Sequence, residues 1–187
     1  MSSIDTQPAV LTAHLSTPSD AVRSLGVQVR ADEPGILVFQ YSLEADMSRV
    51  RFPHSGPGRR ADTLWKHTCF EAFVAPAEES GYYEFNFSPS LDWAIYRFSA
   101  YRNGMSPAEV GRVPEISVRR REDGLDLQSA VTLSEIADLR DARHLRIALA
   151  AVIEDQNGRL SYWALRHPPG KPDFHHPNGF ALEIACS

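Results

Sequence analysis

The chain has 187 residues, a length that fits one medium-sized domain. Apolar residues make up 43% of the chain and charged residues 23%, which is the ordinary balance of a soluble globular protein. The net charge of −5 and the lack of an obviously basic face argue against a nucleic-acid partner, and no stretch reaches the roughly 18 apolar residues that a membrane-spanning helix needs.

Alternation of apolar and polar residues predicts a series of β-strands in the first half of the chain. The turn residues Glu33, Pro34 and Gly35 separate two of these strands and indicate a hairpin. A segment rich in Pro, Gly and Arg, residues 52–63, predicts an exposed loop. The predicted strands are residues 9–15, 26–32, 36–43, 64–74, 82–90 and 92–102.

The second half continues the same pattern and contains a single predicted helix. Asp123 and Gly124 are the strongest hairpin signal in the chain. Residues 134–142 predict a short helix, because Ser134 is a suitable cap and apolar residues follow at helical spacing. The predicted strands of this half are residues 116–121, 125–133, 144–155, 159–167 and 180–185.

About ten short strands with frequent turns predict an all-β fold, an antiparallel β-sandwich of the jelly-roll or immunoglobulin-like kind with one short helix. We expect residues 1–187 to form one domain, in which residues 1–20 form a loosely attached edge strand. The chain has two cysteines, Cys69 inside a predicted strand and Cys186 as the penultimate residue, which do not indicate a disulfide framework. The amino terminus shows no basic start followed by an apolar run, so we expect a cytoplasmic location.

Polar residues stand inside otherwise apolar strands, which raises the question of what they contact. Side chains alternate across a strand with a period of two. This phasing places Glu84 and Asn86 on one face of their strand, and Trp65 and Glu71 on one face of theirs. Trp163 lies on one face of a third strand. If these faces are neighbours, the sheet presents a groove in which indole, carboxylate and amide groups meet. Sugar rings bind to such mixtures, because their C–H faces lie on aromatic rings and their hydroxyls need polar partners.

A structural interpretation stays open beside this one, since Trp in a sandwich often belongs to the core and buried Glu can pair with Arg. Catalytic alternatives also stay open. Glu71 and Glu84 could form the carboxylate pair of a hydrolase. The loop from His167 to His176 brings together side chains that can bind a metal. These side chains are His167, Asp173, His175 and His176.

The segments LWKHTCFEAFV, YYEFNFSPSLDWAIYRFSAYRNGM and SYWALRHPPGKPDFHHP resemble the bacterial DOMON-like proteins, which are related to the family-9 carbohydrate-binding modules. The resemblance runs from about residue 25 to the end of the chain and is most specific over residues 64–102. The residues that fit the order of the family's pattern are Trp65, Glu71, Phe73, Tyr83, Phe85, Asn86 and Pro89.

The resemblance implies a β-sandwich whose concave sheet binds a ligand between two Trp and a set of polar residues. It implies Trp65 and Trp163 as the aromatic pair and Arg97 or Arg102 as the Arg. In the haem-binding members of the family a Met and a His hold iron, but Met47 and Met105 do not match those positions. A haem or redox module is therefore kept as an alternative only.

We expect a protein that binds a small polar ligand, a carbohydrate, without converting it. No catalytic residue, metal or cofactor is assigned, and neither nucleic acid nor membrane is expected as a partner. The oligomeric state does not follow from the sequence. The candidate ligand-binding residues are Trp65, Glu71, Glu84, Asn86, Arg97, Arg102, Trp163 and His167.

Overall fold

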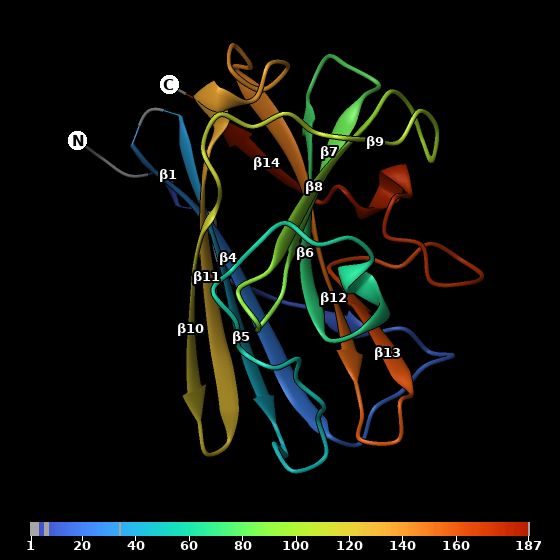
Figure 1. Cartoon of the computed structure of the whole chain (residues 1–187). Coiled ribbons are helices and arrows are strands. Elements are labelled where there is room, and N and C mark those ends of the chain that lie inside the picture. The colour runs from blue at the N-terminus through green and yellow to red at the C-terminus, as the bar shows by residue number, and fades with distance from the viewer. Residues whose placement is uncertain (1–3, 6–7, 34, 187) are drawn as a thin grey trace.

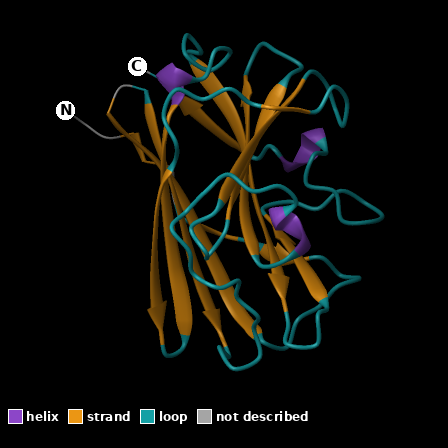
Figure 2. Ribbon diagram, viewed as in Figure 1, coloured by secondary structure: helices purple, strands orange, loops and turns teal. Residues whose placement is uncertain are grey.

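The computed structural model describes residues 4–5, 8–33 and 35–186, and these form two β-sheets packed face to face (Figure 1). The predicted all-β antiparallel sandwich is confirmed, and Figure 2 shows that strands dominate the ribbon. Pro34, in the predicted turn of the first hairpin, lies outside the described residues.

The first sheet, sheet A, has the order β1-β4-β5-β11-β10, with β2 paired to β4. Its long strands form two hairpins, β4 with β5 and β10 with β11, which meet where β5 pairs with β11. The bounds are β1 Ile4–Asp5, β2 Ala9–Val10, β4 Val22–Glu33, β5 Ile36–Ala45, β10 Glu115–Arg121 and β11 Gly124–Thr132.

The second sheet, sheet B, has the order β3-β13-β12-β6-β7-β8-β9, with β14 also paired to β12. Its centre is formed by β12, β6 and β7, and it is the sheet that carries the polar residues singled out above. The bounds are β3 Thr12–Ala13, β6 Cys69–Pro76, β7 Tyr82–Phe87, β8 Trp93–Phe98, β9 Ser106–Pro107, β12 His144–Glu154, β13 Leu160–Ala164 and β14 Leu182–Ala185.

The main core lies between the sheets and is built by the inward faces of both. On β6 the inward residues are Phe70, Ala72 and Val74, and on sheet A Phe39 and Tyr41 meet them. The Tyr41 hydroxyl donates a 2.7 Å hydrogen bond to the main-chain oxygen of Glu71, which ties the two sheets together at the centre of the core.

A second, smaller core covers the outer face of sheet B, the face away from sheet A. The outward side chains of β6 and β7, including Phe73 and Tyr82, are buried there under Leu64, Trp65 and Phe174. These covering residues come from a 3-10 helix, η1 (Leu64–Lys66), and from the loop after β13. Figure 1 shows η1 and the loop after β13 on this side of sheet B. The centre of sheet B is thus buried on both faces, which explains its dense aromatic content.

Two sequence predictions are corrected by the described secondary structure. The predicted helix over residues 134–142 is wrong, because only the 3-10 helix η2 (Leu133–Glu135) forms, followed by turns. Ile136 ends it with extended dihedral angles, yet Ile136 and Leu139 are buried as the apolar spacing indicated. The strand predicted to begin at residue 64 begins at Cys69 instead, because residues 64–66 form η1.

The third 3-10 helix, η3 (Pro177–Gly179), lies near the end of the chain. The hairpin predicted at Asp123 and Gly124 is present, although Arg121 pairs with Gly124 and the two turn residues are Glu122 and Asp123. None of the helices in the described ranges has the length and apolar character needed to cross a membrane.

Candidate functional site: an acidic hollow on the outer face of sheet B

A hollow of about 370 Å³ opens on the outer face of sheet B. Its floor comes from the strands of the sheet and its walls come from η1, the turn after β8 and the loop after β13. The residues that line it are Trp65, Glu71, Glu84, Phe98, Arg102, Met105, Val152, Tyr162, Pro172, Phe174 and His175. Four of the eight residues predicted from the sequence are among them: Trp65, Glu71, Glu84 and Arg102.

Glu71 and Glu84 come to the same hollow because of the register between β6 and β7. Glu71 pairs with Asn86 and Phe73 pairs with Glu84, so that both carboxyl groups project from the outward face of adjacent strands. Both are almost fully buried, with 3% and 4% of their surface exposed. The Asn86 side-chain amide donates a 2.8 Å hydrogen bond to Glu84 Oε1 and holds that carboxyl group in place.

Burial changes the acidity of both carboxyl groups. The pKa of Glu71 is well above its ordinary value, first because burial disfavours the charged form and then because Glu84 lies close by. Burial also raises the pKa of Glu84, although the hydrogen bond from Asn86 and the charge of Arg102 oppose this. Glu71 Oε1 is buried and receives no hydrogen bond from any described residue. Buried oxygens are seldom left so, because the lost hydration costs about 1–3 kcal/mol.

Arg102 reaches the hollow from the turn after β8, where it has a φ of 51°. Its guanidinium group binds Asp173 through two nitrogens, Nε at 3.1 Å and Nη2 at 2.7 Å from Oδ1. Tyr101 donates a hydrogen bond to the other oxygen of the same carboxylate. Asp173 therefore ties the loop after β13 to the turn after β8 and closes one wall of the hollow.

His175 lies between this wall and Glu84. The Arg102 main-chain N–H donates to the Tyr82 hydroxyl at 3.2 Å, and that hydroxyl lies 2.8 Å from His175 Nδ1. The other ring nitrogen of His175, Nε2, lies 3.7 Å from Glu84 Oε2. Burial, followed by the charge of Arg102, lowers the pKa of His175 to about 4. The imidazole is therefore neutral at pH 7.

Aromatic rings form the remaining walls. Trp65 packs edge-on against Tyr96 with 5.7 Å between ring centroids, and Phe98 stacks on Tyr82 at 4.9 Å. Phe174 lies 5.9 Å from Tyr162 on β13. Half-buried Trp65, Tyr162 and Phe174 thus present ring surface around the two acids.

The other four predicted residues do not line the hollow. Asn86 is fully buried on the same face of β7 and holds Glu84 through its side-chain amide. Arg97 lies on the opposite face of β8, where it pairs with Asp138 beside Tyr83. His167 Nε2 lies 2.8 Å from the main-chain oxygen of Thr12, and its ring packs against His14.

The prediction that Trp163 shares a groove with Trp65 is corrected. Trp163 pairs with Ala151 and Ala13, faces sheet A, and belongs to the main core with 7% of its surface exposed. Its indole N–H donates to the Ser161 hydroxyl at 2.9 Å. Since side chains alternate along a strand, it is Tyr162, one residue earlier, that turns outward to the hollow.

Several residues of the hollow were not predicted from the sequence, namely Phe98, Met105, Val152, Tyr162, Pro172 and Phe174, and His175 was named only in the metal alternative. The alternation of aromatic residues along β8 could have indicated that Phe98 lines the hollow. The position of Tyr162 next to Trp163 could have indicated the same for Tyr162. The position of Phe174 had no such signal, because it depends on how a Pro-rich loop folds back over the sheet.

The metal alternative predicted His167, Asp173, His175 and His176 as one cluster, and the structure separates them. His167 binds the Thr12 main chain, Asp173 binds Arg102, His175 meets Tyr82, and His176 caps η3 by accepting from the Asn178 N–H. No group of three or more His, Cys, Asp or Glu side chains arranged to hold a metal occurs in the part of the chain that the structure describes.

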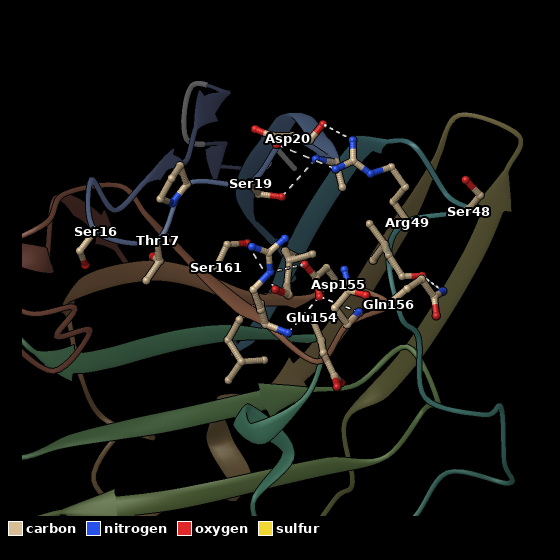
Figure 3. A pocket seen from close by; sticks show the side chains of 17 residues that line it. Ser16, Thr17, Ser19, Asp20, Ser48, Arg49, Glu154, Asp155, Gln156 and Ser161 are labelled. Carbon is tan, nitrogen blue, oxygen red and sulfur yellow. Dashed lines mark hydrogen bonds and ion pairs between the residues drawn. The ribbon is translucent and has the colours of Figure 1, made fainter.

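Another hollow, of about 460 Å³, lies at the end of the β12–β13 hairpin near the segment before β4 (Figure 3). Its charged side chains are paired within the protein. Arg159 lies 3.0 Å from Asp155, Arg49 lies 3.9 Å from Asp20, and Glu154 binds Arg51 at 3.1 Å. It contains none of the predicted ligand-binding residues. The acidic hollow, with an unpaired oxygen, is therefore the candidate site.

No known family profile matches the chain, and no curated protein matches it. Two solved structures are similar. One is a protein from Bacteroides uniformis that is provisionally described as carbohydrate-binding, with a TM-score of 0.68, 18% identity, and coverage of 96% of this chain and 84% of that one. The other is a family-9 carbohydrate-binding module from Caldicellulosiruptor kristjanssonii in complex with glucose, with a TM-score of 0.54, 12% identity, and coverage of 94% and 83%. The chain has the fold of these two proteins.

Proposed function

We propose that the protein binds a carbohydrate, or a small polar ligand of similar chemistry, in the acidic hollow of sheet B and does not convert it. The observation that supports this most is the pairing of ring surface with buried acceptors in one hollow. Trp65 and Tyr162 offer aromatic faces, while Glu71 and Glu84 offer carboxyl oxygens. A sugar needs both kinds of contact. The carbohydrate-binding module that shares the fold was solved with glucose bound.

The test is binding of a panel of mono- and disaccharides by calorimetry, comparing the wild type with Trp65→Ala. Trp exposes roughly 150–250 Å² of side-chain surface, and Trp65 is half-buried. A ligand that covers about 60–100 Å² of the ring gains about 1.5–2.5 kcal/mol at 25 cal/mol per Å². We therefore expect Trp65→Ala to weaken binding by roughly 10- to 60-fold.

A control variant, Leu15→Ala, removes an exposed apolar side chain that does not line the hollow and should bind as the wild type does. Equal affinity of the wild type and Trp65→Ala for every sugar that binds would contradict the proposal. Trp fluorescence gives a second readout, because Trp65 lines the hollow whereas Trp93 and Trp163 are buried in the main core.

A hydrolase is the second candidate, because two carboxyl groups with raised pKa share the hollow. Glycoside hydrolases use such a pair, one as acid and one as base or nucleophile. Chromatography of each sugar after prolonged incubation distinguishes the two functions. Product formation that Glu84→Gln abolishes would support hydrolysis and overturn the proposal of binding alone.

The DOMON-like relationship, the haem or redox alternative and the cytoplasmic location stay predictions. A Soret absorption band in the purified protein would support the haem alternative. Fractionation of cells that express the native gene would test the location.

A further inference from the structure

The charges around the hollow do not balance. Glu71 and Glu84 both project into it, and Glu71 Oε1 has no hydrogen-bond partner among the described residues. Glu84 accepts a hydrogen bond from Asn86 on one oxygen, and its other oxygen lies 3.7 Å from His175 Nε2. At this distance no hydrogen bond forms. The floor of the hollow therefore has acceptor capacity that the protein itself does not use.

The basic residue of the hollow, Arg102, offsets these acids only in part, because its charge opposes the rise in the pKa of Glu84 while its side-chain hydrogen bonds go to Asp173. Both of its bonds to Asp173 are charge-assisted and share one carboxylate oxygen, so the pair is neutral as a unit. His175 is neutral at pH 7, because burial lowers its pKa to about 4. Once the Arg102–Asp173 pair is set aside, the described groups of the hollow that can carry charge at pH 7 are the two acids, and the charge they can carry is negative.

The walls suit a cation as well. Trp65, Tyr162 and Phe174 surround the acids, and the faces of aromatic rings attract ammonium groups. A cation bound in the hollow is attracted both by the faces of the aromatic rings and by the carboxylates. An anion in the same place is repelled by both groups. A neutral ligand gains hydrogen bonds but no charge pairing with the two acids.

We propose that the hollow selects ligands that carry a protonated amine over neutral and anionic analogues of the same shape. This inference rests on the proposed function for its ligand class, in which an amino sugar is the matching member. The ammonium group donates to Glu71 Oε1 and to the carboxyl group of Glu84. Sugar phosphates and uronic acids are excluded by the same two acids.

Binding is then linked to pH. The other titratable groups that face the two acids keep one charge state near neutral pH, since burial raises the pKa values of the tyrosines and of the thiol. These groups are Tyr41 of sheet A, Cys69, Tyr82, Tyr96, Arg102, Asp173 and His175. Because a cation stabilises the ionised acids, its binding releases protons from Glu71 or Glu84. Affinity for the amine should therefore rise with pH up to the pKa of the amine itself.

The experiment compares glucose, glucosamine, 6-amino-6-deoxyglucose and glucuronate by calorimetry at pH 7. We expect at least one amino sugar to bind about ten-fold or more tightly than glucose, and glucuronate to bind most weakly. The preference should disappear in Glu71→Gln and Glu84→Gln, which keep the shape of the side chains, and persist in the control Glu183→Gln on exposed β14. Amino sugars that bind no tighter than glucose, or a preference that survives both variants, would overturn the inference.

A second pair of probes separates this inference from the proposed function. Cyclohexylammonium and cyclohexanol have the same ring and differ in charge, and their binding is measured by thermal shift and Trp fluorescence. If no sugar binds but the ammonium probe does and needs Glu71 or Glu84, the carbohydrate proposal fails and the charge inference stands. If sugars bind regardless of charge and the two probes behave alike, the charge inference fails and the carbohydrate proposal stands.

Discussion

Glu71→Gln should change how the stability of the protein depends on pH. In the folded protein the pKa of Glu71 lies well above 4.5, because of burial and the nearby Glu84. Between about pH 4.5 and this raised pKa, the folded protein binds more protons than the unfolded chain. The free energy of unfolding therefore falls as the pH rises through this window. Gln at this position does not titrate and removes that loss.

The size of the effect follows from the linkage between pKa and stability. Each unit by which the folded pKa exceeds the unfolded value costs about 1.4 kcal/mol at a pH above both. Urea melts at pH 4.5 and pH 7.5 should therefore show that Glu71→Gln gains stability relative to the wild type at the higher pH. The expected gain is about 1.4 kcal/mol for each pH unit of this interval that lies below the folded pKa of Glu71. The free energy of unfolding of the variant is compared with that of the wild type at each pH. This difference cancels the contributions of titrating groups that the substitution does not affect.

Glu183→Gln serves as the matched control, since Glu183 is exposed on β14. It should show the same difference from the wild type at both pH values. If Glu71→Gln behaves like Glu183→Gln, then Glu71 titrates as an exposed acid does. That result would refute the reasoning that the floor of the hollow is a buried, poorly compensated acidic site.

Three further predictions concern residues outside the hollow. Tyr41→Phe removes the hydrogen bond to the Glu71 main-chain oxygen and should lower the free energy of unfolding by about 1–2 kcal/mol in urea melts, with no loss of packing volume. Arg97→Ala should leave sugar affinity within about two-fold of the wild type by calorimetry, because Arg97 pairs with Asp138 outside the hollow. Gly124→Ala should destabilise the protein by about 1–3 kcal/mol in thermal melts, since its Cβ would lie 2.1 Å from the Leu43 main-chain oxygen. Wild-type stability of Tyr41→Phe or Gly124→Ala, or a large loss of affinity in Arg97→Ala, would contradict these assignments.

The strands of sheet B were predictable because their turns and their alternation are local features. The phase of β7, with Glu84 and Asn86 on one face, follows from a period of two and is confirmed by the register with β6. The helix over residues 134–142 was predicted wrongly for the opposite reason. Its apolar spacing reflects two buried contacts, Ile136 and Leu139, which a series of turns satisfies equally well.

The sequence phased the faces of β6 and β7 correctly but not the face of β13, since aromatic residues are buried on both faces of sheet B. In an ordinary sandwich the polar face of a strand meets water, and the apolar face identifies the core. Here Phe73 and Tyr82 are as buried as Phe70 and Phe85, because η1 and the loop after β13 cover them. The position of that covering loop depends on the Arg102–Asp173 contact between distant segments, which no local pattern predicts.

Variants of Trp163 and Tyr162 test most directly which face of β13 lines the hollow, because these two residues are neighbours in the chain and point to opposite faces of the sheet. Trp163 lies in the main core, and Trp163→Phe should lower the melting temperature while the affinity of the folded protein for a bound sugar stays within about two-fold. Tyr162→Ala should weaken binding several-fold and change stability less, because Tyr162 is half-buried at the hollow. The two variants are compared by calorimetry and thermal melts on the same ligand. The opposite result, in which Trp163→Phe impairs binding and Tyr162→Ala does not, would mean that the ligand contacts the other face of β13 and that the acidic hollow is not its site.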